Sequence, residues 1–209
     1  MRIEVERFDA NGAHAYLMVR MRSDKPRELS LSVHHHPGSA PIEELTLDAT
    51  MGNYERLRHL WLKNRILDSR DLYRGYSGNG FAQREEYPIE EILKTAGGDA
   101  IALLTTDEHD PASVEVRHGN WQYRSVKLTQ YWRVPAKHMQ PDLRVFVNGR
   151  RVYWNSEFEV PGGIAFESFQ IRQRYVPGQE FIFGLTPEAP WEIRPALPRL
   201  GRLPERWRP

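Results

Sequence analysis

The stretch "HAYLMVRMR", residues 14–22, has apolar side chains at every second position, from Ala15 to Met21. The positions that alternate with these hold His14, Tyr16, Arg20 and Arg22, with Met18 as the apolar exception. Successive side chains of a β-strand point to opposite faces of its sheet. A period of two residues therefore predicts a strand here, with one apolar face and one polar face.

A second strand precedes this one, because "RIEVERF", residues 2–8, has the same period. Asn11-Gly12 lies between the two segments, and Asn-Gly favours a tight turn with positive φ. The sequence thus predicts a β-hairpin across residues 2–22. The same alternation, or a short apolar run, predicts further strands at residues 28–33, 43–51, 99–106, 121–134, 164–175 and 180–185.

Residues 53–73 fit two structures. A helical face behind an Asn53 N-cap fits part of the segment, whereas the apolar residues around Lys63-Asn64 fit a hairpin. The neighbouring segments are all predicted strands, so we favour a strand–turn–strand arrangement.

Two other segments carry local signals. Asn148-Gly149, within residues 142–155, predicts a two-residue hairpin turn. Residues 88–98 carry the best helix signal, with Pro88 suited to the first helical position and acidic residues in the first turn.

The number and spacing of these strands predict the fold class. Roughly ten to twelve strands and one short helix favour an all-β, single-domain β-sandwich of jelly-roll or concanavalin-like type. An up-and-down barrel is the alternative. We expect the sandwich to occupy residues 1–189. Residues 190–209 are rich in proline and arginine, which predicts an extended tail that packs across the domain or onto a partner subunit of a homo-oligomer.

Composition and charge limit the function classes. The chain has 29 Lys and Arg against 28 Asp and Glu, a net charge of +1 that argues against nucleic acid or an anionic membrane as partner. It has no cysteine, which removes disulfides, thiolate metal sites and a cysteine nucleophile. The sequence shows no secretory signal and no run of roughly 20 apolar residues, so we expect a cytoplasmic protein.

Three predicted strands combine aromatic and cationic side chains on their polar faces. The hairpin at Asn148-Gly149 would place Arg144 opposite Tyr153 and Phe146 opposite Arg151. The residues of these faces that we select as substrate-binding candidates are Tyr123, Lys127, Arg133, Arg144, Arg151, Tyr153 and Arg172. Aromatic rings stack on the C–H faces of sugars, and guanidinium pairs bidentately with carboxylate. If the faces belong to one sheet, the sequence predicts a surface for a carbohydrate, and for an acidic one in particular. Solvated outer faces are the alternative.

Three consecutive histidines end the strand at residues 28–33. Alternation places His35 on the apolar side and leaves His34 and His36 on the polar side. An H-x-H pair on a strand resembles the metal site of cupin-type jelly rolls. The cupin pattern also has a glycine six residues before the first histidine and a glutamate shortly after the second. This chain has Glu28 at the first position and no acidic residue between His36 and Glu43, so we do not assign it to the cupins. The two histidines are candidate metal ligands or candidate catalytic bases.

Acidic residues supply two further candidates. Asp107, His109 and Asp110 follow a strand and have the chemistry of a divalent-metal site, for Ca²⁺ or another cation. A polar turn at the strand end is the alternative. Glu167 lies among arginines on its strand, as an ion-pair partner or as a general acid or base.

These candidates lead to three hypotheses. The first is a carbohydrate-active enzyme that cleaves an oligo- or polysaccharide, possibly one containing uronate. In an eliminative lyase, Tyr131, His34 or His36 is the base and Arg133 or Lys127 neutralises the carboxylate. In a glycoside hydrolase, Glu167 and Asp107 are the carboxylate pair. The chain is similar to concanavalin-like polysaccharide lyases in size and strand alternation. The second hypothesis is a non-catalytic sugar-binding module, and the third is a structural or assembly protein.

Overall fold

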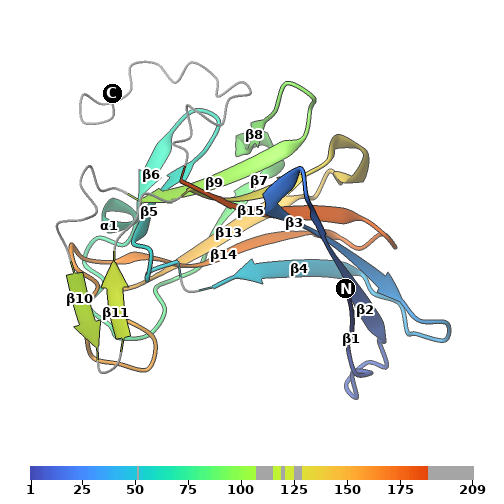
Figure 1. The fold of residues 1–209 in the computed structure, drawn as a ribbon, viewed down its shortest axis with the longest axis horizontal. Coiled ribbons are helices and arrows are strands. Elements are labelled where there is room, and N and C mark those ends of the chain that lie inside the picture. Colours follow the sequence, from blue (N-terminus) through green and yellow to red (C-terminus); the bar gives the residue numbers. More distant parts are fainter. Residues whose placement is uncertain (51, 107–114, 119–120, 125–128, 188–209) are drawn as a thin grey trace.

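The computed structural model describes residues 1–50, 52–106, 115–118, 121–124 and 129–187, without the side chains of 115–118 and 121–124. Two antiparallel sheets pack face to face, so the predicted all-β sandwich is confirmed (Figure 1). Among the described residues, no helix has the length and apolar character needed to cross a membrane.

The larger sheet has nine strands and is called the large sheet below. In spatial order it contains β1 (Arg2–Glu4), β2 (Ala15–Arg22), β3 (Lys25–His35), β15 (Glu180–Thr186), β12 (Thr129–Val134), β9 (Ala100–Thr106), β5 (Leu57–Trp61) and β6 (Ile66–Asp68), with β8 (Leu93–Lys94) paired to β9. The predicted first hairpin is confirmed, because β1 pairs with β2 and Gly12 has a φ of +73°. The hairpin around Lys63-Asn64 is confirmed by the pairing of Trp61 with Ile66.

The small sheet has four strands, in the order β4 (Glu44–Ala49), β14 (Ala165–Arg174), β13 (Arg144–Arg150) and β7 (Glu85–Pro88). A separate two-stranded sheet pairs β10 (Glu115–His118) with β11 (Trp121–Arg124).

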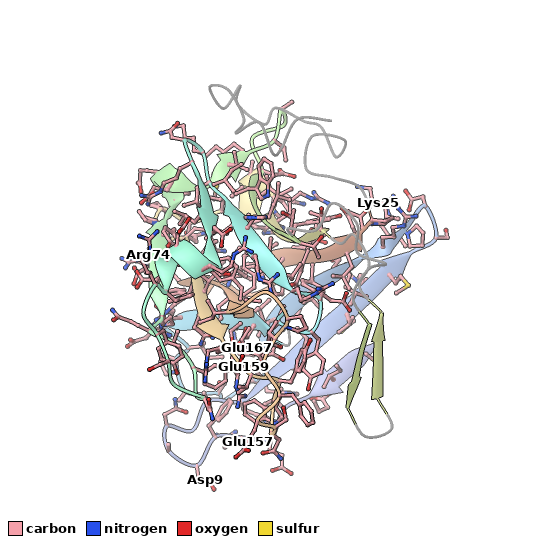
Figure 2. All side chains as sticks on the ribbon, turned by 90° about the vertical axis from the view of Figure 1, so that its left-hand side faces the viewer. Asp9, Lys25, Arg74, Glu157, Glu159 and Glu167 are labelled. Atoms are coloured by element: carbon pink, nitrogen blue, oxygen red, sulfur yellow. The ribbon has the colours of Figure 1, made fainter. Side chains whose placement is uncertain are left out.

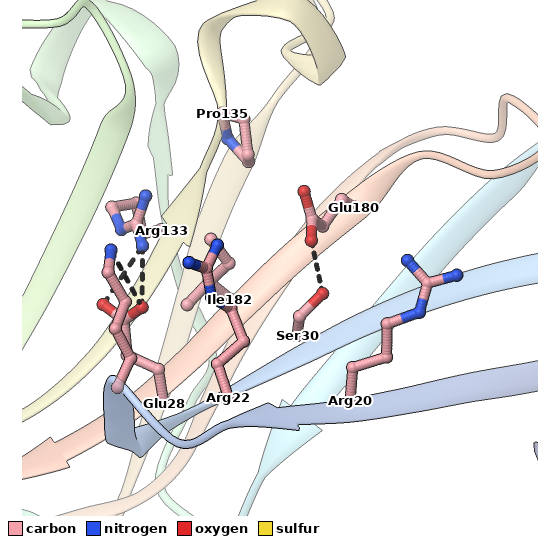
Figure 3. Close-up of a pocket in the computed structure, with 9 residues that line it drawn as sticks. Arg20, Arg22, Glu28, Ser30, Arg133, Pro135, Glu180 and Ile182 are labelled. Atoms are coloured by element: carbon pink, nitrogen blue, oxygen red, sulfur yellow. Dashed lines mark hydrogen bonds and ion pairs between the residues drawn. The ribbon is translucent and has the colours of Figure 1, made fainter. Parts of the chain in front are cut away.

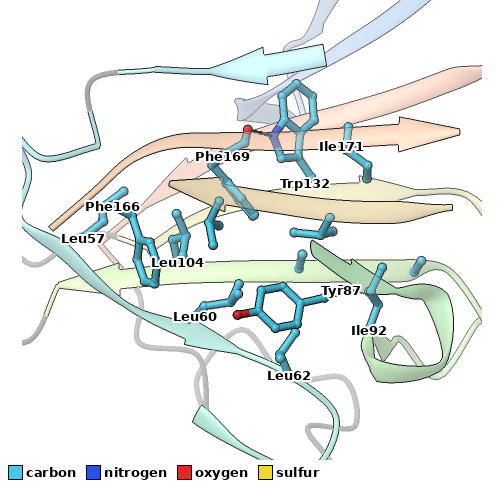
Figure 4. Close-up of a cluster of buried hydrophobic side chains, with 14 of the residues drawn as sticks. Leu57, Leu60, Leu62, Tyr87, Ile92, Leu104, Trp132, Phe166, Phe169 and Ile171 are labelled. Carbon is cyan, nitrogen blue, oxygen red and sulfur yellow. Dashed lines mark hydrogen bonds between the residues drawn. The ribbon is translucent and has the colours of Figure 1, made fainter. Parts of the chain in front are cut away.

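The core fills the space between the two sheets (Figure 4). Large apolar side chains from both inner faces meet there, among them Leu60, Leu104, Trp132, Val145, Phe166 and Phe169. Every residue of β9 is buried, as its continuous apolar run predicts. Figure 4 also shows the Trp132 indole donating its Nε1 hydrogen to the Phe169 carbonyl oxygen, at 2.8 Å.

The predicted hairpin at Asn148-Gly149 is wrong, because β13 runs straight through these two residues. Asn148 pairs with Ser168 and Gly149 pairs with Phe166, so the partner strand carries one extra residue, Glu167, in a β-bulge. Gly149 does not form a turn but allows the Tyr73 ring to pack closely against β13. A Cβ at position 149 would lie 2.7 Å from the Tyr73 ring. The predicted cross-strand pairs of Arg144 with Tyr153 and of Phe146 with Arg151 are therefore wrong as well.

The predicted helix at residues 88–98 is also wrong. This segment contains the end of β7, a single 3₁₀ turn (Ile89–Glu91) and β8. Tyr87 pairs with Val145 at the edge of the small sheet and Leu93 is buried against the large sheet, so the segment crosses between the sheets. The short α-helix in the described residues, α1, is Ser69–Leu72, where the Asp68 carboxylate accepts a hydrogen bond from the Arg70 amide at 2.8 Å.

The single strand predicted at residues 121–134 is two strands in two different sheets. β11 belongs to the two-stranded sheet and β12 lies at the centre of the large sheet. Residues 125–128, between them, lie outside the described residues, as does the tail predicted at residues 190–209.

Candidate functional site

The surface of the large sheet that points away from the small sheet is called the outer face below. Trp132 and Val134 of β12 pack in the core, so Tyr131 and Arg133, which alternate with them, lie on the outer face. Residues paired directly across antiparallel strands share a face, which places their partners on it too. Four strands thus line the outer face with Tyr16, Arg20, Glu28, Ser30, Ser32, His34, Glu180, Ile182, Tyr131 and Arg133. The predicted split of the histidine triplet is confirmed on β3, where His34 shares this face with Ser30 and Ser32.

A charged pocket of about 190 Å³ lies on the outer face where β2, β3, β15 and β12 meet (Figure 3). Its charged lining consists of the cations Arg20, Arg22, Lys25 and Arg133 and the carboxylates Glu28 and Glu180. The Ser30 hydroxyl donates to Glu180 on the neighbouring strand. The lining therefore has an excess of positive charge and several hydrogen-bonding groups.

Glu28 is the centre of a hydrogen-bond network in this pocket. It accepts a hydrogen bond from the Tyr131 hydroxyl at 2.9 Å, and Arg133 Nη2 donates to both of its oxygens at 2.9 and 3.0 Å. Arg133 Nη1 donates to Asp99 at 3.0 Å. Burial alone raises the pKa of Glu28, but the Tyr131 hydrogen bond and the Arg133 charge outweigh it and hold the pKa below its usual range. Glu28 is thus an ionised anchor for both side chains.

Gly184 of β15 makes this network sterically possible. It lies directly between Glu28 and Tyr131 in the sheet, paired with both. A Cβ at position 184 would lie 2.1 Å from Tyr131 Cζ. The Tyr131 ring therefore crosses over β15 at a glycine, which has no side chain, and the Tyr131 hydroxyl can reach Glu28.

The cations of the pocket differ in how far they are neutralised. Arg133 is bound to two carboxylates, and Arg22 makes two hydrogen bonds to Asp24, at 2.7 and 2.9 Å. Lys25 Nζ lies 3.6 Å from Glu28. Arg20 is exposed and has no carboxylate partner among the described residues. Arg20 is the cation of this pocket that is available to a negatively charged ligand.

A histidine cluster lies at the other end of the outer face, where β1, β2 and β3 meet. The His14 and His36 rings stack with their centroids 3.9 Å apart, and the His34 ring stacks on Tyr16 at 5.0 Å. His36 Nε2 lies 2.9 Å from a Glu4 oxygen. His34 Nε2 lies 3.1 Å from the Ser32 hydroxyl.

Two groups of this histidine cluster have shifted pKa values. Burial lowers the pKa of His14, and the nearby charges of His36 and Arg7 lower it further, so the imidazole is neutral at neutral pH. Burial raises the pKa of Glu4, but its hydrogen bonds with His36 and Arg2 lower it by more. The cluster therefore contains a neutral imidazole able to accept a proton and an ionised carboxylate that orients another imidazole.

The charged pocket and the histidine cluster lie at a defined separation. Ser30 stands beside Arg20, and His34 follows four residues later on the same strand. At about 3.3 Å per residue, the two sites are about 13 Å apart along β3. A ligand that contacts both must be extended and must lie along this strand.

Several predicted substrate-binding residues lie elsewhere. Arg144 and Arg172 are on the outer surface of the small sheet, where they form ion pairs with Glu86 and Glu44. In the connection that follows β13, Arg151 pairs with Glu159 at 2.8 Å, and the buried Tyr153 packs on Tyr54 with ring centroids 4.9 Å apart. The predicted single surface of all these residues is thus divided between two sheets and a loop.

Glu167 also lies away from the outer face. It sits in the β-bulge of β14 in the small sheet and is 2 % exposed. Figure 2 views the side of the molecule on which Glu159 and Glu167 lie. The charge of Glu167 adds to the effect of burial in raising the pKa of Tyr54. The structure therefore separates Glu167 from the candidate bases His34, His36 and Tyr131.

Within the described part of the chain, no group of three His, Asp or Glu residues is arranged to bind a metal ion. Asp107, His109, Asp110 and Lys127 lie outside the described residues, and the side chain of Tyr123 is not described.

Sequence reasoning did not select five residues of the candidate site: His14, Arg20, Glu28, Glu180 and Gly184. Alternation did place His14 and Arg20 on the polar face of residues 14–22, so that signal was present. Nothing local marked Gly184, because its role comes from a tyrosine on another strand. In comparisons with known proteins, no family, no curated protein and no solved structure matches this chain.

Proposed function

We propose that the outer face binds an acidic oligosaccharide that lies along β3, with one end in the charged pocket and the other at the histidine cluster. The observation that carries this proposal is the presence of both sites on one sheet face, with Arg20 available to an anion. The ligand's carboxylate pairs with the Arg20 guanidinium, which suits bidentate recognition.

The other groups of the pocket suit the hydroxyls of a sugar. Glu28 and Glu180 accept hydrogen bonds and the cations around them donate, which gives the mixed donor and acceptor pattern that hydroxyl groups need. The two carboxylates also favour a ligand with few, separated negative charges over a polyphosphate, because a dense anion meets repulsion from both of them.

Eliminative cleavage of the same ligand is a second candidate function, favoured by the neutral His14 imidazole beside His36 and Glu4. In this reaction a base removes the proton from the carbon that bears the carboxylate. The electron pair of the broken C–H bond forms a double bond to the neighbouring carbon, and the glycosidic oxygen on that carbon leaves and is protonated. Tyr131 is a positioning residue in this proposal, because its hydroxyl donates its hydrogen to the Glu28 carboxylate. Arg20 would hold a neighbouring sugar unit, since it lies about 13 Å from His34 along the strand.

Titration calorimetry tests the binding proposal. We expect oligogalacturonate to bind and a neutral malto-oligosaccharide of equal length not to bind. Arg20→Gln should weaken oligogalacturonate binding about tenfold or more, because a charge-assisted contact is lost. Arg174→Gln, an exposed arginine on the small sheet, is the matched control and should bind as the parent does. Equal binding of both sugars, or full affinity in Arg20→Gln, would contradict the proposal.

Ultraviolet absorbance of the unsaturated product tests elimination on the same samples. Product formation that is lost in His14→Gln or His36→Gln would establish a lyase. His35→Gln is the matched control, because His35 belongs to the same triplet but is hydrogen-bonded to Tyr175 on the opposite side of the sheet. Binding without any product would identify a non-catalytic binding module.

A further inference from the structure

A second cavity lies on the inner side of the large sheet, where the small sheet ends. It is a cleft of about 390 Å³ between the inner faces of β3, β15 and β12 and the chain that leaves β4 toward β5. Leu31, Trp132 and Phe183 form its apolar wall, and its polar lining residues are Gln130, Glu55, Thr50 and Asp48. Asp48 already accepts a hydrogen bond from Gln170 Nε2, at 2.9 Å. The volume falls at the lower end of the range for small-molecule sites.

Glu55 is carried into this cleft by a compact turn. The Gly52 carbonyl oxygen accepts hydrogen bonds from the Glu55 amide at 3.2 Å and the Leu57 amide at 3.1 Å. Arg56 adopts a left-handed conformation with a φ of +50°, which turns the chain into β5. A Cβ at Gly52 would lie 2.7 Å from the Phe166 carbonyl oxygen, so the turn lies tightly against β14. Glu55 is thus held in position at the mouth of the core.

Two polar groups of the cleft, those of Glu55 and Gln130, have unused hydrogen-bonding capacity. Among the described residues, the shielded Glu55 Oε2 has no hydrogen-bond partner, and burial raises the pKa of this carboxyl although Arg56 partly offsets the effect. Gln130 is 5 % exposed, and its amide group makes no hydrogen bond within the described part of the chain. Buried polar groups are normally paired, so this pair of side chains indicates a ligand.

We propose that the cleft binds a small primary amine with an apolar tail. The ammonium group donates to the Glu55 carboxylate and to the Gln130 amide oxygen. The tail packs on Leu31 and on the paired rings of Trp132 and Phe183, whose centroids lie 5.0 Å apart. The Trp132 Nε1 hydrogen is already donated to Phe169, so the indole offers its apolar surface and its π-electrons.

The charge of Glu55 selects this ligand class over others. A carboxylate ligand with the same tail meets repulsion from Glu55, and an alcohol leaves the carboxylate without a counter-charge. The cleft and the charged pocket lie on opposite faces of the large sheet, so this inference does not depend on the proposed sugar binding.

Calorimetry with hexylamine, hexanol and hexanoate tests the inference, since the three probes share one tail. We expect hexylamine to bind best and hexanoate to bind worst. Glu55→Gln, which preserves the size of the side chain, should weaken hexylamine binding at least tenfold. Glu157→Gln, in an exposed loop, is the matched control. Equal affinity for the three probes, or no loss in Glu55→Gln, would overturn the inference.

A pH series on the unaltered protein provides a second test that requires no variant. Hexylamine pairs with the ionised carboxylate, so its affinity should fall as the pH is lowered through the raised pKa of Glu55. Affinity that is constant across this range would contradict the assigned partner, whatever the folding behaviour of the variant.

Discussion

The outer surfaces of the two sheets carry similar residues but differ in what those residues contact. On the small sheet, Arg84 and Arg172 lie over the Phe146 ring at 4.7 and 5.6 Å, and Phe146 is only 2 % exposed. Arg172 and Arg144 each form an ion pair. On the large sheet, Arg20 keeps its charge available beside a pocket. Aromatic and cationic residues on a strand therefore indicate a binding surface only where their charges and rings are not already satisfied by neighbours.

Phe146→Ala should have the largest effect on stability and no effect on oligogalacturonate binding at the outer face. Removing a nearly buried phenylalanine from the small sheet should lower the free energy of unfolding by about 3 kcal/mol. Urea unfolding measures this loss, and oligogalacturonate affinity of the folded protein should remain unchanged. Phe158→Ala, at a half-exposed phenylalanine, is the control and should cost about 0.5 kcal/mol. Reduced sugar binding in Phe146→Ala would show that the small sheet belongs to the site.

Gly184→Ala should have an intermediate effect that reaches both stability and binding. The added methyl group clashes with the Tyr131 ring, so overpacking should cost about 2 kcal/mol and move the tyrosine away from Glu28. Urea unfolding and calorimetry measure the two effects. Gly97→Ala is the matched control, because the nearest atom to a Cβ there is 3.8 Å away. Unchanged stability in Gly184→Ala would mean that Tyr131 does not cross β15 as described.

Glu28 should give the smallest effect, measured as a dependence of stability on pH. Its pKa is lowered in the folded protein from an ordinary value of 4.5. The stability that it contributes is therefore present above the unfolded-state pKa and is lost as the pH falls through the folded-state pKa. Urea unfolding between about pH 6 and pH 3 measures this effect. The free energy of unfolding should decrease less with falling pH for Glu28→Gln than for the parent protein. Parallel curves would contradict the role of Glu28 as an ionised anchor.

Strand faces were predictable wherever the alternation was regular. His34 and His36 could be separated from His35, because side-chain direction follows directly from strand geometry. The buried character of β9 was predictable from its continuous apolar run. The first hairpin was predictable from the Asn11-Gly12 turn, and the second from the apolar residues around Lys63-Asn64.

Local signals failed where packing across the core outweighed them. Asn148-Gly149 continues a strand because Gly149 admits the Tyr73 ring and Asn148 accepts a hydrogen bond from the Ser168 amide at 3.2 Å. The helix predicted at residues 88–98 does not form, because Tyr87 pairs in the small sheet and Leu93 pairs in the large sheet. Burial of these side chains stabilises the chain by more than turn or helix propensity does.

The period of each strand, and hence which of its side chains share a face, follows from the order of its own residues. Which strands become neighbours follows from the folded chain as a whole. The tertiary structure placed β15 and β12 beside β3, which brings Glu180, Tyr131 and Arg133 to Ser30 and Glu28, and it sent Arg144 and Arg172 to the other sheet. The physical reason is that a strand's period is set by its own backbone, whereas its place in a sheet depends on core packing and pairing between residues far apart in the chain.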